Sequence, residues 1–157
     1  DNDLPDFNSY AMDNRTYRYF KGAALYPFGF GLSYTNFKYS YLNLPATVKP
    51  GKTITVTTTI TNTGKMAGEE VAQLYVWSEN SKTLIRALKG FKRISLKPGQ
   101  SKTIRFKLTP EDLSTVNEKG ERETPKGKVT ISVGGGQPGQ SIKANSNVVN
   151  WTMSIKK

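Results

Sequence analysis

The chain has 157 residues, which is enough for one β-sandwich of about 100 residues together with an additional segment. It contains no cysteine and no histidine, which excludes disulfides, thiol nucleophiles, Cys/His zinc sites and any mechanism with imidazole as the base. Its 23 Lys and Arg residues outnumber its 12 Asp and Glu residues, and the resulting net charge of +11 is spread along the whole chain.

The positive charge has two interpretations. One is attraction to a polyanion such as nucleic acid, an acidic polysaccharide or lignin. The other, which the spacing of Lys102, Arg105 and Lys107 favours, is a soluble surface whose cations lie on strand faces and protect sheet edges. No nucleic-acid-binding motif accompanies the charge, and no apolar run approaches the ~18 residues of a membrane span. Neither nucleic acid nor a membrane is therefore an expected partner.

Residues 1–33 form the first segment of the chain. Aromatic residues, glycines and prolines follow one another there without a sustained helical or strand period, which predicts an extended arm. Each aromatic side chain buries about 150–250 Å², so rings at this density are expected to lie against another surface.

From residue 34 to residue 157 the pattern changes to alternating apolar and polar residues between turn signals. The expected strands contain Phe37, Tyr39 and Tyr41; Ile54, Val56, Thr58 and Ile60; Val71 to Trp77; Leu88 to Ile94; Ile104, Phe106 and Leu108; Val129, Ile131 and Val133; and Val149, Trp151, Met153 and Ile155. Thr109 to Leu113 predicts a single capped helical turn. Strands without a long helix predict an all-β sandwich. Its core is expected to be led by Ile54, Val56, Leu74, Val76, Phe91, Ile104, Phe106, Ile131 and Trp151.

Three blocks of sequence carry a resemblance to a known family. They are Arg15 to Phe20 continuing through Leu25 to Thr35 (RTYRYF and LYPFGFGLSYT), Asn62 to Tyr75 (NTGKMAGEEVAQLY), and Leu88 to Phe91 followed by Leu96 to Gly99 (LKGF and LKPG). In this order they resemble the C-terminal fibronectin type III-like module of family 3 glycoside hydrolases. The segments LPDF before the first block and VGGGQP near the end resemble the β-xylosidases of that family more than its β-glucosidases.

The resemblance implies a fibronectin type III-like (immunoglobulin-like) sandwich over residues 34–157, preceded by an arm from upstream catalytic domains over residues 1–33. It also implies that the chain alone is not an enzyme, because the family's aspartate nucleophile and glutamate acid/base match no residue here. The acidic residues, Glu69 and Glu70 included, are then expected to be solvated, and no cofactor is expected. The implied parent is a retaining β-xylosidase or β-glucosidase, extracellular or periplasmic, whose catalytic domains this module braces.

Two other roles stay open at this stage. The chain could be a polymer-binding module that holds the parent enzyme on anionic plant polysaccharide or lignin, or it could be one polypeptide of an enzyme made of several chains. Tyr75 and Trp77 lie on the opposite strand face from Leu74, so an exposed pair would form a sugar-stacking platform. Coverage of both faces of that strand is the favoured alternative.

The candidate docking residues toward the catalytic domains all lie in the arm, and they are Arg15, Tyr17, Arg18, Tyr19, Phe20, Tyr26 and Phe28. No metal site is expected. The acids between Glu111 and Glu123 are interleaved with Lys119 and Arg122, which argues against a calcium cage. The glycines Gly134 to Gly136 are interpreted as a strand-end turn rather than a phosphate loop.

Overall fold

The structure of the chain is a computed structural model. It describes residues 6, 8–10, 12, 15–19, 22, 24–26, 28–78, 86–116, 119–124, 126–139 and 146–156, and at residues 17 and 18 it describes the backbone only. Within these ranges the chain consists almost entirely of strands. One helical turn, α1 (Thr16–Tyr19), interrupts the arm, which was expected to be extended throughout.

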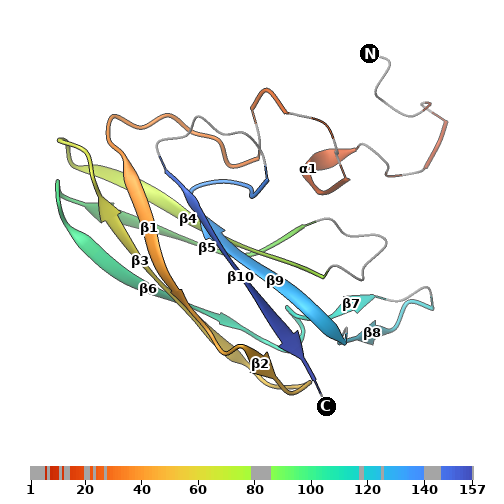
Figure 1. The fold of residues 1–157 in the computed structure, drawn as a ribbon. Coiled ribbons are helices and arrows are strands. Elements are labelled where there is room, and N and C mark those ends of the chain that lie inside the picture. Colours follow the sequence, from red (N-terminus) through yellow and green to blue (C-terminus); the bar gives the residue numbers. More distant parts are fainter. Residues whose placement is uncertain are drawn as a thin grey trace.

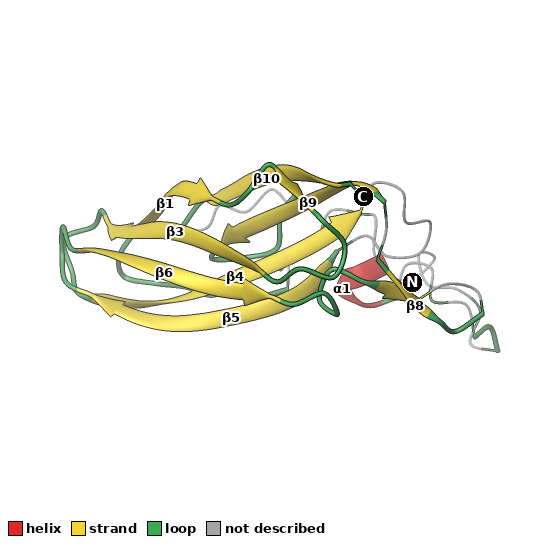
Figure 2. Cartoon of the chain, turned by 90° about the horizontal axis from the view of Figure 1, so that it is seen from below, coloured by secondary structure: helices red, strands yellow, loops and turns green. Residues whose placement is uncertain are grey.

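The described strands form two larger sheets and a short ribbon (Figure 1). The three-stranded sheet has the order β1 (Phe37–Asn43), β3 (Ile54–Asn62), β6 (Ser101–Leu108). The five-stranded sheet has the order β2 (Thr47–Val48), β10 (Val148–Ile155), β9 (Gly127–Gly134), β4 (Gly68–Ser78), β5 (Ala87–Leu96). The ribbon pairs β7 (Thr115–Val116) with β8 (Arg122–Glu123). In both Figure 1 and Figure 2, α1 and β8 lie toward the same end of the long strands. The predicted all-β sandwich is confirmed.

The core lies between the two larger sheets because alternate residues of their strands are apolar. In β3, Ile54, Val56 and Ile60 are buried, while the threonines between them face outward. Ile104, Phe106 and Leu108 are buried in the same way from β6, as expected. The predicted helical turn at Thr109 is also present, because Thr109 Oγ1 accepts a hydrogen bond from the Asp112 amide and the Asp112 carboxylate accepts one from the Thr109 amide.

Three aromatic residues differ from the expected pattern. Phe91 is 72% exposed because its partner across β4 is Gln73, whose side chain lies on the outer face of the sheet. Trp151 is 41% exposed because β10 is covered on its outer edge only at Ser154 and Ile155, by the two-residue strand β2. Both residues were wrongly placed in the core.

Tyr41 is 84% exposed, although it continues the alternation of Phe37 and Tyr39. The register of β1 against β3 shifts between Ser40 and Asn43, so two residues of β1 oppose one residue of β3. Tyr41 occupies the first bulge position with a φ of 54°, a left-handed conformation that favours glycine. Leu42 packs partly against the core in its place.

Asn62 connects both sheets to the end of the arm. Its side chain is fully buried and donates to the carbonyls of Met66 (2.8 Å) and Leu96 (3.0 Å). Its Oδ1 accepts from Thr35 Oγ1 (2.6 Å) and from the Gly64 amide (3.0 Å). All hydrogen-bonding positions of this amide are therefore used, as a buried polar group requires. The carboxyl end of the arm is held where β3, β4 and β5 meet.

The packing of Phe106 depends on a glycine in the opposite sheet. A Cβ placed on Gly90 would lie 3.2 Å from the Phe106 ring, so a side chain here would press on the ring and glycine lets β5 lie close to it. A glycine within a strand often marks such a close approach.

We predict that Phe106→Ala lowers the free energy of unfolding by about 3–5 kcal/mol, because it leaves a cavity between the sheets. Phe91→Ala is the matched control, since this ring is 72% exposed and its loss should change stability by less than about 0.5 kcal/mol. Urea denaturation followed by fluorescence measures both values. Similar losses in the two variants would contradict the strand orientations described above.

Candidate functional site: a glycine-lined pocket beside the arm

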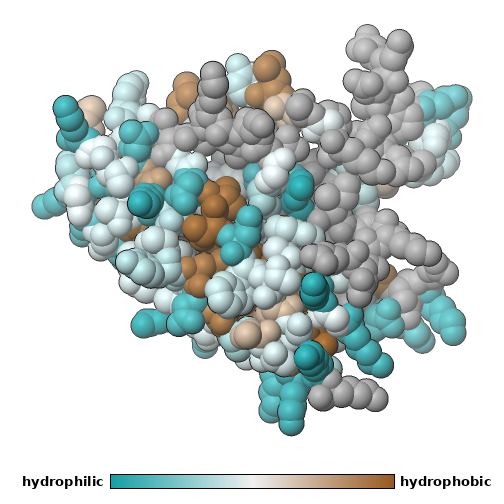
Figure 3. All heavy atoms as spheres, in the orientation of Figure 1, coloured by the Kyte–Doolittle hydropathy of each residue, from teal (hydrophilic) through white to brown (hydrophobic). Residues whose placement is uncertain are grey.

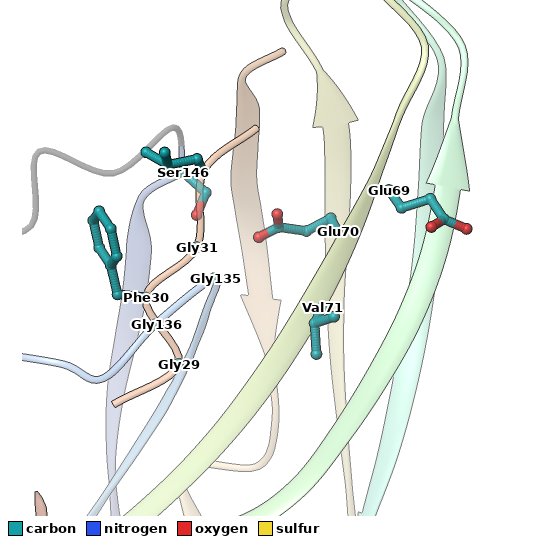
Figure 4. Close-up of a pocket in the computed structure, with 10 residues that line it drawn as sticks. Gly29, Phe30, Gly31, Glu69, Glu70, Val71, Gly135, Gly136 and Ser146 are labelled. Atoms are coloured by element: carbon teal, nitrogen blue, oxygen red, sulfur yellow. The ribbon is translucent and has the colours of Figure 1, made fainter. Parts of the chain in front are cut away.

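A pocket of about 180 Å³ lies where the arm meets the sandwich (Figure 4). Four segments form it: arm residues 29–32, residues 69–71 at the start of β4, Gly135 and Gly136 after β9, and Ser146 before β10. The glycines Gly134 to Gly136 do end a strand, as expected, and two of them also line this pocket.

Gly135 is required by the close approach of two polar side chains. A Cβ at this position would collide with Ser146 Oγ and with Glu70 Oε1. Any other residue would displace the side chains of Ser146 and Glu70 from these positions. The glycine therefore allows the Glu70 side chain to lie between β1, β4 and this segment.

Glu70 is a buried acid, not the solvated one expected from the sequence. It is 9% exposed, and its Oε1 accepts a hydrogen bond of 2.8 Å from the Tyr39 hydroxyl. Burial raises the pKa of Glu70 above its ordinary value, and the hydrogen bonds from Tyr39 and Ser146 offset part of that rise. Burial together with the negative charge of Glu70 likewise raises the pKa of the Tyr39 hydroxyl, so this group stays a donor.

Tyr39 is held by its backbone as well as by its hydroxyl. The Tyr39 amide donates to Asn147 Oδ1 (2.6 Å), and Asn147 Nδ2 donates to the Tyr39 carbonyl (3.1 Å). Phe37 also forms a parallel bridge with Ser146. The Asn147 amide thus acts like a neighbouring strand for β1 and closes the seam between the two sheets at the pocket.

The pocket does not contain a pair of carboxylates suited to glycoside hydrolysis. A retaining mechanism needs two carboxyl groups about 5–5.5 Å apart on either side of the scissile bond. Glu69 precedes Glu70 along β4 and points to the opposite side of the strand, as Figure 4 shows, where it pairs with Arg93. The acid Glu70 is instead engaged by Tyr39 and Ser146, so its arrangement is structural.

Tyr75 and Trp77 do not form an exposed stacking platform. Tyr75 is fully buried, and its hydroxyl donates to Gln73 Oε1 (2.6 Å). Trp77 is half-buried, with the Arg86 guanidinium 6.0 Å from its ring centre. The favoured expectation, that both faces of this strand are covered, agrees with these positions, whereas a sugar ring has no access to Tyr75.

Residues 29–32 of the arm line the pocket beside the sandwich, and most other described residues of the arm are exposed. Gln73 Nε2 donates to the carbonyls of Gly135 (3.2 Å) and Gly29 (3.5 Å), which joins the arm to the outer face of β4. Tyr26 and Phe30 pack against each other with ring centres 5.2 Å apart. Arg15 does not reach outward, because its guanidinium donates to the carbonyls of Asp6 and Ser9.

The remaining docking candidates differ in their exposure. Tyr19 is half-buried, Phe28 is 46% exposed and Tyr26 is 70% exposed. Phe20 and the side chains of Tyr17 and Arg18 lie outside the described residues. Whether these residues contact a catalytic domain stays a prediction.

Other acids of the described chain are engaged locally. Glu111 pairs with Arg122 at 3.3 Å, and Asp112 caps the turn at Thr109. Among the described residues no group of three or more His, Cys, Asp or Glu could hold a metal ion. In that same part of the chain no helix is long and apolar enough to cross a membrane.

Sequence reasoning missed Tyr39, Glu70, Asn147 and Gly135 as parts of one cluster. Tyr39 was placed in its strand correctly, but no short-range pattern joins it to Asn147, which is 108 residues away. The usable signal was the position of Glu70 two residues before Ala72 in the most apolar strand, because that spacing places its side chain on the core face.

Comparisons with known proteins agree with this architecture. Residues 70–137 match the family model described as fibronectin type III-like domain. A β-xylosidase of Formosa agariphila is 43% identical over 85% of this chain and 19% of its own length. A periplasmic β-glucosidase of Salmonella typhimurium is 37% identical over 82% of this chain and 17% of its own length.

Solved structures give the same relationship. The crystal structure of a β-glucosidase from Listeria innocua in complex with glucose superposes with a TM-score of 0.75 at 29% identity, over 85% of this chain and 18% of that one. A β-D-glucoside glucohydrolase from Trichoderma reesei gives a TM-score of 0.70 at 34% identity, over 83% of this chain and 20% of that one.

The chain therefore contains a fibronectin type III-like domain that is similar to segments of β-xylosidases and β-glucosidases, and the resemblance noted in the sequence is confirmed. It spans about a fifth of the length of the curated relatives that it matches.

We predict that Glu70→Gln flattens the dependence of stability on pH. Because burial raises the pKa of Glu70 in the folded chain, the folded state holds this proton more tightly than the unfolded state does. The stability that Glu70 contributes is then complete below the ordinary value of 4.5 and is lost as the pH rises through the raised pKa. The amide introduced by this substitution keeps an oxygen that can accept from Tyr39 but cannot ionise.

The measurement is the free energy of unfolding between about pH 4 and 8, in the wild type and in this variant. Glu69→Gln, which changes the neighbouring surface carboxylate, is the matched control and should keep the wild-type slope. An unchanged slope in Glu70→Gln would show that Glu70 does not titrate differently in the two states.

Proposed function

We propose that this chain is a non-catalytic module of a β-xylosidase or β-glucosidase and that it braces the catalytic domains of that enzyme. The observation that carries the proposal is the apolar surface of the arm, which a domain with a closed core does not need for its own folding. The names of the relatives support the class of enzyme, and the small share of their length that is matched leaves room for separate catalytic domains.

The exposed apolar side chains are concentrated in and just after the arm. Those described there are Tyr10 (99%), Met12 (45%), Leu25 (86%), Tyr26 (70%), Phe28 (46%), Leu32 (92%) and Tyr34 (93%). Exposed apolar side chains in this number favour an interaction site. Each large side chain that a neighbouring domain covers completely would stabilise the contact by about 1.5–3 kcal/mol.

The arm is suited to join two bodies because one of its parts is already attached. Gly29 is hydrogen-bonded to Gln73, and Thr35 is hydrogen-bonded to Asn62. Between these two anchors, Leu32 and Tyr34 extend into solvent. Attachment on one side and apolar exposure on the other would hold a catalytic domain at a fixed position on this module.

The location proposed for the parent enzyme is extracellular or periplasmic. One relative is named a periplasmic β-glucosidase. A core of this size needs no disulfide to be stable outside the cytoplasm, so the lack of cysteine is compatible with that location.

We predict that the purified chain alone hydrolyses neither aryl β-xylosides nor aryl β-glucosides, because the buried Glu70 has no partner carboxylate facing it in the pocket. Release of the chromogenic aryl group is the measurement. Activity that follows the chain through successive purification steps, and is lost in Glu70→Gln, would contradict this prediction.

We also predict that the double substitution Leu32→Ser and Tyr34→Ser lowers the thermal stability of the intact glycosidase. The loss of apolar contact should lower the temperature at which glycosidase activity is lost by several degrees, while kcat/KM at low temperature changes little. Val116→Ser is the matched control, since Val116 is an exposed apolar residue (56%) on the distant β7–β8 ribbon. Equal inactivation temperatures for the double variant and the wild type would exclude the bracing role.

A further inference from the structure

The outer face of the three-stranded sheet is a regular array of hydroxyl groups. Strand partners present their side chains on the same face, and the register pairs Thr55 with Lys107, Thr57 with Arg105, Thr59 with Thr103 and Thr61 with Ser101. Lys38 and Ser40 of β1 continue the rows beside Thr61 and Thr59. These side chains are exposed or half-buried. Figure 3 shows mainly pale and teal atoms at the left, over β1, β3 and β6.

The hydroxyl groups of this face are arranged in hydrogen-bonded pairs. Thr59 Oγ1 lies 3.1 Å from Thr103 Oγ1, and Thr61 Oγ1 lies 2.8 Å from Ser101 Oγ. Each pair uses one hydroxyl proton internally, so one proton and several lone pairs remain for a ligand. Successive pairs along the strands are about 6.8 Å apart, and the rows are about 4.8 Å apart. Such a face can both donate to and accept from the hydroxyl groups of a sugar chain.

All charged side chains on the three strands of this sheet are positive. None of the three strands contains Asp or Glu, whereas Lys38, Arg105 and Lys107 lie on the outer face. The cations stand at intervals among the hydroxyls and do not form one dense cluster. An extended ligand with separated negative charges would match this spacing.

Tyr41 adds an aromatic ring at the edge strand of the same sheet. Its side chain is 84% exposed, and the residue lies in the bulge between Ser40 and Asn43. The left-handed backbone that the bulge imposes on this bulky residue costs of order 1–3 kcal/mol. A ring in this position can stack on a sugar, which the buried Tyr75 cannot do.

We propose that the outer face of the three-stranded sheet binds a carboxylate-bearing polysaccharide. The Thr and Ser rows contact the sugar hydroxyls, Arg105, Lys107 and Lys38 contact the carboxylates, and the Tyr41 ring stacks on one sugar. The choice of a polysaccharide among extended polyanions rests on the proposed function as a glycosidase module. The binding itself does not depend on the bracing role, because this face lies on a different sheet from the anchor of the arm at Gln73.

The test measures the affinity of the whole chain for polygalacturonate by isothermal titration at 20 and 150 mM salt. Binding is expected at low salt and should weaken at higher salt, since the screening length falls from roughly 20 Å to about 8 Å. Arg105→Gln with Lys107→Gln should weaken binding about two- to thirtyfold. Lys89→Gln with Lys92→Gln, which removes the same charge from β5 of the other sheet, is the control and should leave most of the affinity.

The variant Tyr41→Asn distinguishes the contribution of the ring to binding from its contribution to stability. Asparagine adopts the left-handed conformation readily, so this variant should unfold at the same or a higher temperature than the wild type. Without the ring, its affinity should fall about two- to tenfold. A lower unfolding temperature with unchanged affinity would show that Tyr41 serves only the strand.

Three outcomes would overturn the proposal. They are the absence of binding at 20 mM salt, an equal loss of affinity in the control pair, and tighter binding of a single-stranded DNA oligonucleotide than of polygalacturonate. The last result would show a surface selective for phosphate. None of these outcomes bears on the inactivation temperature of the arm variants, so failure here can be distinguished from failure of the bracing role.

Discussion

The buried Glu70 carboxyl is the constraint on which the arrangement of the pocket end depends. A carboxyl group taken out of water must be hydrogen-bonded, and here the Tyr39 hydroxyl and Ser146 provide those bonds. Tyr39 can donate from this position only because the Asn147 amide holds its backbone, and Ser146 approaches only because residue 135 is glycine. The arm then closes over the same place, where residues 29–32 line the pocket. Removing a single member would leave a buried polar group without its partner, so the four segments are expected to order together.

The bulge in β1 shows how the strand combines two requirements. Phe37 and Tyr39 must face the core, and β1 must then turn toward β2 so that Val48 can pair beside β10. One additional residue in β1 lets Leu42 pack against the core, and the same residue count leaves Tyr41 in solvent. Thr58 compensates part of the disruption, since its buried hydroxyl donates to the Ser40 carbonyl (3.0 Å). The strained backbone of Tyr41 therefore belongs to a bulge that the sandwich needs, and the exposure of the Tyr41 ring follows from that bulge.

The fold could be predicted from the sequence because the alternation of apolar residues is strong in β3, β6 and β9. Ile54, Val56, Ile104 and Ile131 are buried as expected. The errors have local physical causes. Phe91 lies on an edge strand opposite Gln73. Tyr41 lies in a bulge whose left-handed position carries neither Gly nor Asn, so the sequence gives no signal for it. The pocket could not be predicted as a unit, since Tyr39, Glu70, Gly135 and Asn147 meet only after the strands are paired. Acids in a lysine-rich chain are usually solvated, and only the phase of Glu70 within β4 indicated otherwise.

The two sheets use their outer faces differently, and burial explains the difference. On the five-stranded sheet Gln73 and Tyr75 are buried although they point away from the core, and Ser132, beside Tyr75 on β9, is fully buried with no hydrogen-bond partner for its hydroxyl among the described residues. This outer face is covered where the arm attaches, since Gln73 Nε2 donates to the carbonyl of Gly29 in the arm and also to the carbonyl of Gly135 after β9. The three-stranded sheet is not covered in this way, and its threonine hydroxyls pair with one another across the strands and remain accessible. The arm is thus attached to the outer face of one sheet, and the proposed ligand face is the outer face of the other sheet.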